Sequence, residues 1–245
     1  MDILWYIFGG LMKRILLAVF AAALIGTPAL AGDVRMFDWS GWYFGGGVGW
    51  QGSSIGLSNP TVGFPLTYRP HHDSVAVSGH IGAQHQWGQL VLGIEGDYLA
   101  AFHRASLGAT PAPGIFSSGG TGTAQAKLKD IWSIGGRAGW AMGAWLPYVI
   151  AGYANGSFDF DAHTTGLSNI IPISEHANAK PNGAYLGAGI DWALTNNWIF
   201  GVEYRHYFFE AKTVTGVATT FTEPVRFDPK TDTVMARLTY KFGGL

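Results

Sequence analysis

The chain contains no cysteine among its 245 residues. This absence excludes disulfide bonds and metal sites built from thiolates, although it does not identify the compartment. Charged residues are also scarce, at 13% of the sequence, compared with about 25% in a typical soluble domain. A soluble domain with so few charges would have little polar surface to keep it dissolved.

The net charge of the chain is −1. A nucleic-acid partner requires a basic patch, so the balance of charges argues against that class of function. Glycine and aromatic residues are abundant, at 36 residues and 14% respectively. The apolar residues are spread out instead of being gathered into helices. Strands that each present one face to lipid would reconcile this composition with the low charge.

Downstream of the N-terminal region, every apolar run is shorter than the roughly 20 residues that a membrane helix needs. The N-terminal region has the features of an export signal: Lys13 and Arg14, an apolar run over 15–25, and the small-residue cleavage pattern Ala29-Leu30-Ala31. We therefore predict a signal peptide over residues 1–31, with Met12 as an alternative start, and one barrel domain over residues 32–245. The alternative is a retained membrane helix, for which the run is too short.

Eight segments after residue 40 alternate apolar residues with small or polar ones, which is the period of a β-strand. In the first segment Trp42, Phe44, Val48 and Trp50 share one face. In the fifth segment both faces are apolar, so its orientation stays open. The predicted strands cover residues 41–52, 73–87, 89–103, 126–142, 145–157, 181–194, 197–211 and 231–242.

The connections between these segments alternate in length. Long loops are predicted over residues 52–72, 104–125, 158–180 and 212–230, and tight turns at 88, 143–144 and 195–196. Prolines fall in loops or near strand starts, as at Pro147, Pro181 and Pro229, and none is expected at a strand centre. Long outer loops with short periplasmic turns are typical of outer-membrane proteins. The predicted fold is all-β, an eight-stranded antiparallel up-and-down transmembrane β-barrel with both chain ends on the periplasmic side.

Aromatic residues near the segment ends predict a girdle at each membrane interface, where amphipathic indoles settle. Trp42 and Trp50 lie eight residues apart on one face, as do Trp132 and Trp140. This spacing fits a tilted strand of about 9–11 residues across the membrane. The predicted girdle consists of Trp42, Trp50, Trp132, Trp140, Trp192, Trp198, Tyr240 and Phe242.

The opposite, inward face carries acids and bases in equal number. The predicted interior charge network consists of Glu95, Asp97, Asp191, Glu203, Arg137, Arg205, Arg237 and Lys241. An eight-stranded barrel is just wide enough for side chains to fill, and buried charges are tolerated when they are paired. We expect a salt-bridged plug with inward glycines making room for the long side chains. The alternative is a group of catalytic carboxylates, but balanced charge inside a barrel needs no substrate to explain it.

Two motifs resemble known chemistry without the context that the chemistry requires. Residues 47–52 match GxGxxG and residues 52–56 match GxSxG, but each motif needs a strand followed by a helix. The histidines are scattered and form no ligand-spaced set, although His71-His72 could bind metal adventitiously. We therefore predict no catalytic residue, no metal site and no cofactor.

The residues Trp39-Ser40-Gly41-Trp42-Tyr43-Phe44-Gly45-Gly46 resemble the opening strand of the small outer-membrane β-barrels of alphaproteobacteria, often described as porin-like. The stretch Leu146-Pro147-Tyr148-Val149 and the end Ala236-Arg237-Leu238-Thr239-Tyr240-Lys241-Phe242 are similar to later strands of that family. The resemblance implies an eight-stranded barrel like that of OmpA or OmpX in the bacterial outer membrane. The last strand also resembles the signal read by the barrel-assembly machinery, although Gly243-Gly244-Leu245 follow the usual terminal aromatic.

Three functions are consistent with this pattern. The first is a non-enzymatic surface protein that supports envelope integrity and offers its loops for contacts with an unidentified extracellular ligand. The second is a narrow, porin-like diffusion channel for small solutes. The third is a barrel enzyme acting on lipid A, a class that uses a His-x-Ser pair on a strand; the sequence has this spacing at His72-Asp73-Ser74. The expected partners are outer-membrane lipid and lipopolysaccharide, and the assembly machinery during insertion.

Overall fold

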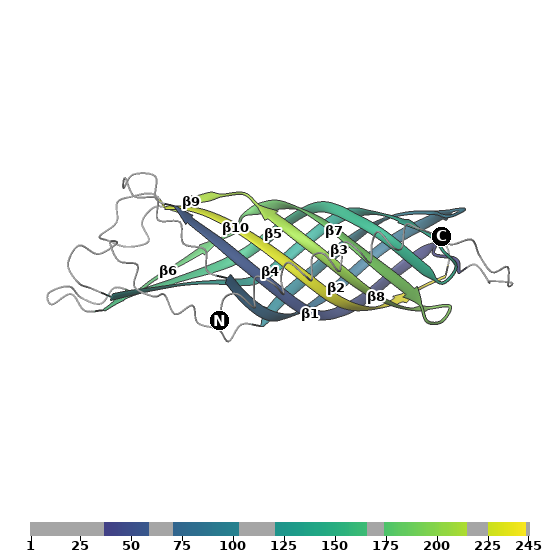
Figure 1. Cartoon of the computed structure of the whole chain (residues 1–245), viewed down its shortest axis with the longest axis horizontal. Coiled ribbons are helices and arrows are strands. Elements are labelled where there is room, and N and C mark those ends of the chain that lie inside the picture. The colour runs from purple at the N-terminus through teal and green to yellow at the C-terminus, as the bar shows by residue number, and fades with distance from the viewer. Residues whose placement is uncertain (1–36, 59–70, 103–120, 166–173, 215–224, 244–245) are drawn as a thin grey trace, which may run out of the picture. The chain divides into compact units, whose positions relative to one another are not determined.

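The computed structural model describes residues 37–58, 71–102, 121–165, 174–214 and 225–243. Within these ranges the chain forms strands joined by turns, and the strands close into an antiparallel barrel in which they cross the long axis obliquely (Figure 1). No helix in the described ranges is both long and apolar enough to cross a membrane. The predicted all-β, eight-stranded antiparallel barrel is confirmed.

Each barrel strand pairs with its neighbours along the chain, and the first strand pairs with the last. The eight barrel strands are β1 (Gly41–Ser58), β2 (His71–Trp87), β3 (Leu90–Phe102), β4 (Thr121–Trp140), β5 (Trp145–Thr165), β7 (Asn182–Ala193), β8 (Trp198–Phe209) and β10 (Val225–Lys241). Pairing of β1 with β10 leaves no open edge along the wall, so the backbone hydrogen bonds are satisfied within the barrel, as lipid requires.

The register is staggered around the barrel. Hydrogen-bonded partners followed laterally from Trp42 return to β1 at Gly52 instead of Trp42. The intervening partners are Ala83, Ile94, Gly136, Ala151, Leu186, His206 and Asp232. This stagger tilts the strands and sets a narrow interior that side chains can fill.

Two further strands lie at the long-loop end of the barrel. β6 (Ser174–Ala179) pairs with the far part of β5, and β9 (Lys212–Val214) pairs with the start of β10. Together with the extension of β1 to Ser58, they show that the predicted loops were drawn too long. These extensions are poorer in apolar alternation than the spanning segments, so the period that identifies a lipid-facing strand does not reveal them.

Pro229 lies inside β10 and not at its start, which corrects the predicted proline placement. Its partner on β1 is Ile55, but on the other side the pairing of β10 changes from β8 at Lys230 to β9 at Phe227. Proline lacks a backbone N–H, so it fits a position where the ladder on one side is interrupted.

The three short connections fall where the sequence predicts them. Gly88 and Gly143 have φ angles of 60° and 63°, a left-handed conformation that glycine adopts without steric cost. In the third turn the Thr195 hydroxyl accepts hydrogen bonds from the backbone amides of Asn197 and Trp198. This side chain stabilises a turn that has no glycine.

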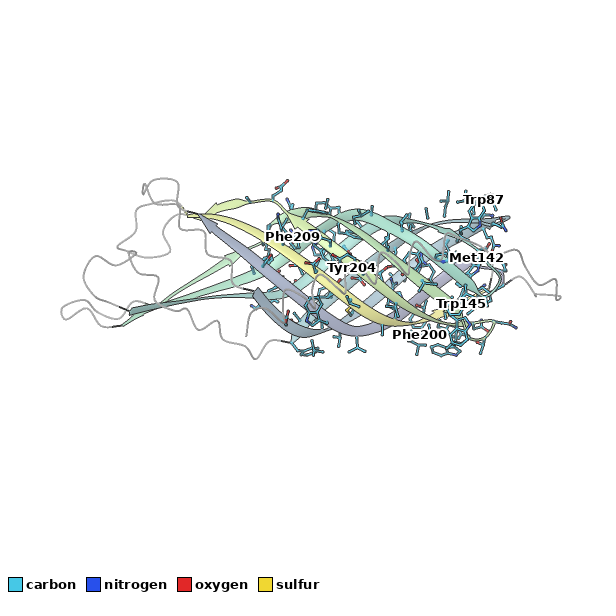
Figure 2. All side chains as sticks on the ribbon, in the orientation of Figure 1. Trp87, Met142, Trp145, Phe200, Tyr204 and Phe209 are labelled. Carbon is cyan, nitrogen blue, oxygen red and sulfur yellow. The ribbon has the colours of Figure 1, made fainter. Side chains whose placement is uncertain are left out.

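Burial alternates along the strands as a barrel wall requires. In β4, for example, Ile131 is 0% exposed and Ile134 is 55% exposed. Figure 2 shows apolar side chains projecting from the outer wall, with Trp87, Met142 and Trp145 toward the short-turn end. The orientation of the fifth predicted strand is now fixed, since Tyr148 and Ile150 of β5 point inward and Val149 points outward.

The interior is not polar throughout. One buried apolar cluster at the short-turn end contains Trp39, Val91, Ala141, Leu146 and Ile199. A second contains aromatic and aliphatic residues of the upper wall, including Leu99, Ile131, Phe158, Tyr207 and Phe209. The second cluster also includes Tyr148 and Tyr185, which contact the buried charges. The interior therefore combines apolar and charged side chains, where the sequence predicted a polar interior alone.

Candidate functional site: the interior charge network

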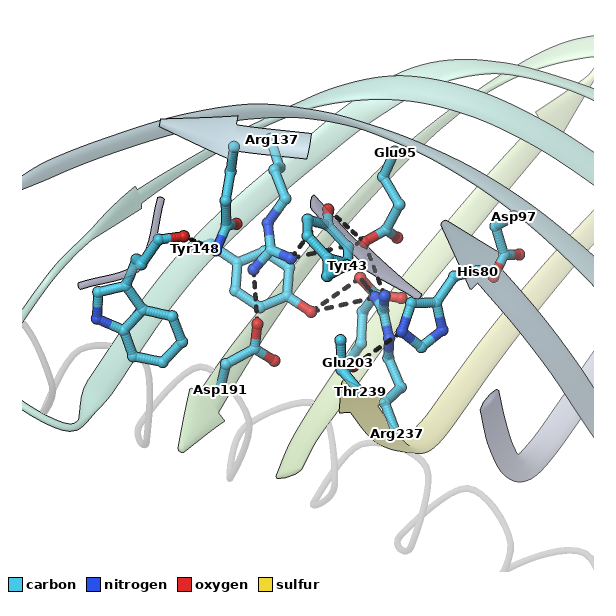
Figure 3. A network of polar contacts seen from close by, with 12 residues as sticks. Tyr43, His80, Glu95, Asp97, Arg137, Tyr148, Asp191, Glu203, Arg237 and Thr239 are labelled. Atoms are coloured by element: carbon cyan, nitrogen blue, oxygen red, sulfur yellow. Dashed lines mark hydrogen bonds and ion pairs between the residues drawn. The ribbon is translucent and has the colours of Figure 1, made fainter. Parts of the chain in front are cut away.

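Glu95 of β3 is the centre of the charge network, and its side chain is fully buried. Its two oxygens lie 2.7 Å from Arg205 Nη2 and 2.7 Å from Arg237 Nη2. The Tyr43 hydroxyl donates a hydrogen bond of 3.0 Å to the same carboxylate. Figure 3 shows Glu95, Tyr43 and Arg237 converging in the lumen from different strands. One carboxylate thus joins β3 to β1, β8 and β10.

The remaining acids are paired with these two arginines or with Arg137 of β4. Glu203 Oε2 lies 2.5 Å from Arg237 Nη1, and its other oxygen lies 2.7 Å from Arg205 Nε. Asp97 Oδ1 is 3.4 Å from Arg205 Nη1. Asp191 accepts a hydrogen bond of 2.6 Å from Arg137 Nη2. Charge-assisted contacts of this kind offset the cost of burying the charges.

Aromatic and hydroxyl groups complete the network. The Tyr148 hydroxyl donates to Glu203 at 2.9 Å, and the Arg137 guanidinium lies 3.9 Å from the centre of the Tyr148 ring. His80 Nε2 and the Thr239 hydroxyl share a hydrogen bond of 2.8 Å (Figure 3). Tyr43, Tyr148 and His80 belong to the network although the prediction from the sequence, which rests on charge, does not include them. Their inward position on alternating strands is the signal that would identify them.

Inward glycines make room for these tyrosines. Tyr43 faces Gly82 across the β1–β2 ladder, and Tyr148 faces Gly189 across the β5–β7 ladder. A Cβ added at Gly189 would lie 2.6 Å from Tyr148 Cζ, well inside van der Waals contact. The inward glycines are therefore sites where a ring lies against the backbone.

We expect Gly189→Ala to destabilise the folded barrel by about 1–3 kcal/mol, because the added methyl group would push the Tyr148 ring away from Glu203. Urea unfolding in lipid vesicles, followed by tryptophan fluorescence, measures the change. Gly96→Ala is the matched control, since its added Cβ would meet nothing closer than 3.9 Å. Equal losses in both variants would contradict the packing argument.

Lys241 does not join the central network, which corrects the sequence prediction. Its Nζ donates to the backbone carbonyl oxygens of Asp38 at 2.5 Å and Ser40 at 3.2 Å, at the short-turn end. Burial of Asp38 opposes its ionisation, but hydrogen bonds from the Ser40 amide and hydroxyl, with the Lys241 charge, hold the pKa of Asp38 below its usual value. The centre therefore contains four acids and three arginines.

The segment before β1 packs into the barrel mouth. Trp39 is fully buried, and its backbone N–H donates to Gln86 Oε1 at 2.9 Å while its carbonyl accepts from Gln84 Nε2 at 2.8 Å. Phe37 packs edge-on against the Trp39 ring. This apolar layer covers the charge network on the short-turn side.

The predicted girdle residues lie on the outer wall at two levels. Trp42, Trp140, Trp192, Trp198, Tyr240 and Phe242 lie near the short-turn end, and Trp50 and Trp132 lie toward the long loops. Trp192 stacks on Trp145, with ring centres 5.2 Å apart. Trp145 and the exposed Trp87 also lie in the girdle, although they are absent from the predicted set. Both adjoin tight turns, which is the signal that would have identified them.

The network has the features of a structural core. Glu95, Asp97, Asp191 and Glu203 each contact at least one arginine. In the described part of the chain, no group of three or more His, Asp or Glu side chains is arranged to hold a metal ion. Such an arrangement can hold strands together and obstruct the lumen.

Comparison with known proteins identifies the family. Residues 16–242 match the outer membrane protein beta-barrel domain. The chain is 27% identical over 255 residues to the 31 kDa outer-membrane immunogenic protein of Brucella melitensis biotype 1, covering 94% of this chain and 100% of that protein. It is also 27% identical over 180 residues to the 22 kDa outer membrane protein of Rhizobium leguminosarum bv. viciae, covering 71% of this chain and 66% of the relative.

Among solved structures, the outer membrane protein OprG from Pseudomonas aeruginosa aligns with a TM-score of 0.50 at 13% identity, over 86% of this chain and 100% of OprG. This likeness concerns the fold alone. The predicted resemblance to the small outer-membrane barrels of alphaproteobacteria is confirmed by the sequence relatives. The chain belongs to the outer membrane protein β-barrel domain family and is a protein of the bacterial outer membrane.

Proposed function

We propose that this protein is a non-enzymatic surface protein: a closed barrel that anchors in the outer membrane, supports the envelope and holds four loop regions outside the cell. The observation that carries the proposal is the filled cross-section. Glu95 contacts Arg205 and Arg237 across the lumen, and two clusters of buried apolar side chains fill further parts of the interior. An interior of this kind favours an anchor over a conduit.

The relatives support surface display. The Brucella relative is described as an outer-membrane immunogenic protein, which means that it elicits an immune response. We infer that the long-loop end of this barrel faces outward, as long outer loops do in outer-membrane barrels. The pairing of every central carboxylate with arginine supports the non-enzymatic part of the proposal, because a general acid or base must be able to exchange its proton with a substrate.

Single-channel recording in a planar bilayer tests the closed lumen. We expect the refolded protein to give no reproducible discrete openings. The variant Tyr43→Ser/Tyr148→Ser removes two rings that lie 5.6 Å and 3.9 Å from the Arg137 guanidinium, and it should give openings if those rings help to fill the section. Discrete openings in the unaltered protein would overturn the closed barrel and favour the narrow diffusion channel.

A further inference from the structure

The charges of the central network do not balance when every group is ionised. Lys241 does not supply the missing positive charge, because it lies at the short-turn end and donates to backbone carbonyl oxygens. An uncompensated charge is costly inside a protein. The centre therefore needs one further positive charge. Its ionised members are four acids and three arginines: Glu95, Asp97, Asp191, Glu203, Arg137, Arg205 and Arg237.

Asp97 is the acid with the weakest pairing. Its Oδ1 lies 3.4 Å from Arg205 Nη1, which is longer than a charge-assisted hydrogen bond. The same guanidinium lies 2.7 Å from Glu95 and 2.7 Å from Glu203, and its Nη1 donates to Ser133 Oγ at 3.2 Å. The Asp97 side chain is only 6% exposed. A buried carboxyl group thus shares one arginine with two acids that are closer to it.

The other neighbours of Asp97 are neutral or belong to the same network. His80 is its ladder partner on β2, and Ser133 is its ladder partner on β4. Figure 3 shows Asp97 and His80 at the edge of the network, away from Asp191. Within the described residues, His80 Nδ1 is buried without a hydrogen-bond partner. The groups that interact electrostatically with Asp97 from β3, β7, β8 and β10 are Glu95, Tyr185, Glu203, Arg205, Tyr207 and Arg237.

A proton on Asp97 supplies the missing charge. A metal ion would need several ligands, and the described side chains nowhere bring together three His, Asp or Glu groups that could hold one. His80 is the other group able to carry the proton, but its imidazole interacts with the three guanidinium groups of the centre. A positive charge on that ring would be repelled by all three. Protonation of Asp97 removes the excess negative charge and places no new cation beside the arginines.

We propose that Asp97 keeps its proton at about pH 6, where an ordinary aspartate is ionised, and that it makes the charge network a pH-sensitive lock. The neutral Asp97 carboxyl leaves Arg205 to Glu95 and Glu203. When the pH rises and Asp97 ionises, a fourth negative charge competes for Arg205 and weakens the contact of β8 with Glu95 of β3. The lock is therefore strongest while Asp97 is protonated. This inference goes beyond the proposed function and does not depend on whether the lumen is closed.

Infrared spectroscopy of the refolded protein in lipid vesicles detects the proton directly, because a protonated carboxyl group has a carbonyl stretch that a carboxylate lacks. We expect this band at about pH 6, its loss when the pH is raised, and its absence from D97N. If the unaltered protein shows no such band at about pH 6, the proposal is overturned. Aspartate-specific ¹³C labelling of the unaltered protein gives the same test without a substitution, since a band that does not shift on labelling would also overturn it.

The effect on stability is tested by comparing D97N with E95Q, two substitutions on the same face of β3. Aspartate in the unfolded chain ionises near about pH 4. Above that pH, and until folded Asp97 ionises, the folded state binds one more proton, so rising pH destabilises it. We expect the unfolding constant of the unaltered protein to rise about tenfold per pH unit relative to D97N in this window. At about pH 8, well above both ionisations of ordinary carboxyl groups, E95Q should unfold more readily than the unaltered protein and D97N should not. A D97N variant as weakened as E95Q at that pH would overturn the proposal.

Discussion

Glu95→Gln should lower the free energy of unfolding by about 3–5 kcal/mol, the cost of leaving a buried charge without its partner. The substitution keeps the size of the side chain and removes its charge. Arg205 and Arg237 would each lose an ion pair of 2.7 Å, with no solvent to replace it. The net free energy of unfolding of a protein is small. This loss is therefore a large fraction of the total free energy of unfolding. Urea unfolding in vesicles, with gel migration of unboiled samples as a second measure, reports the change.

Glu210→Gln is the matched control for that prediction. Glu210 carries the same carboxylate at the long-loop end of β8, where it is exposed. Exposed ion pairs contribute about 0–1 kcal/mol, so this variant should unfold almost as the unaltered protein does. A Glu95→Gln variant that behaves like Glu210→Gln would show that the network fills the lumen without stabilising it.

The fold was predictable because lipid imposes one rule on every spanning strand. An outward residue must be apolar or small, so a period of two can be read from single segments, such as Trp132, Ile134 and Trp140 of β4. The residues between the outward ones must then face inward. This odd–even alternation, or parity, predicted lumenal positions for Glu95, Arg137, Glu203, Arg205 and Arg237. Parity fixes which side a residue faces but gives no partner, because partners depend on the stagger around the barrel.

That stagger explains what the sequence did not reveal. Lys241 has the inward parity of Arg237, but it lies at the short-turn end, where the backbone carbonyls of Asp38 and Ser40 are its partners. The apolar part of the interior was hidden for a different reason. In β5 both faces are apolar, since Leu146 and Ile150 fill the lumen while Val149 faces outward. Beyond the membrane neither face is constrained by lipid, so the ends of β1, β5 and β10 have no alternation to read.

The network also gives a structural role to many of the few charged residues in this chain. The three central arginines each contact two or more groups, including Glu95, Glu203 and Asp191, and they connect β3, β4, β7, β8 and β10. In a closed barrel these cross-lumen pairs join strands that share no ladder, such as β3 and β10. The interior therefore fixes which strands lie opposite each other, in addition to the register that the hydrogen bonds fix between neighbours.

Ile134→Arg should destabilise the barrel by about 2–4 kcal/mol, the cost of an arginine at the lipid midplane of an outer-membrane barrel. Ile134 is 55% exposed on the outer wall and lies between Trp132 and Trp140 along β4. Ser117→Arg adds the same charge in the predicted loop between β3 and β4 and should be nearly silent. The free energies of unfolding of the two variants are compared in vesicles whose hydrocarbon thickness matches the height of the apolar outer wall. Equal effects of the two substitutions would mean that the outward face of β4 does not contact lipid. The same result would contradict the faces assigned by alternation in the other strands.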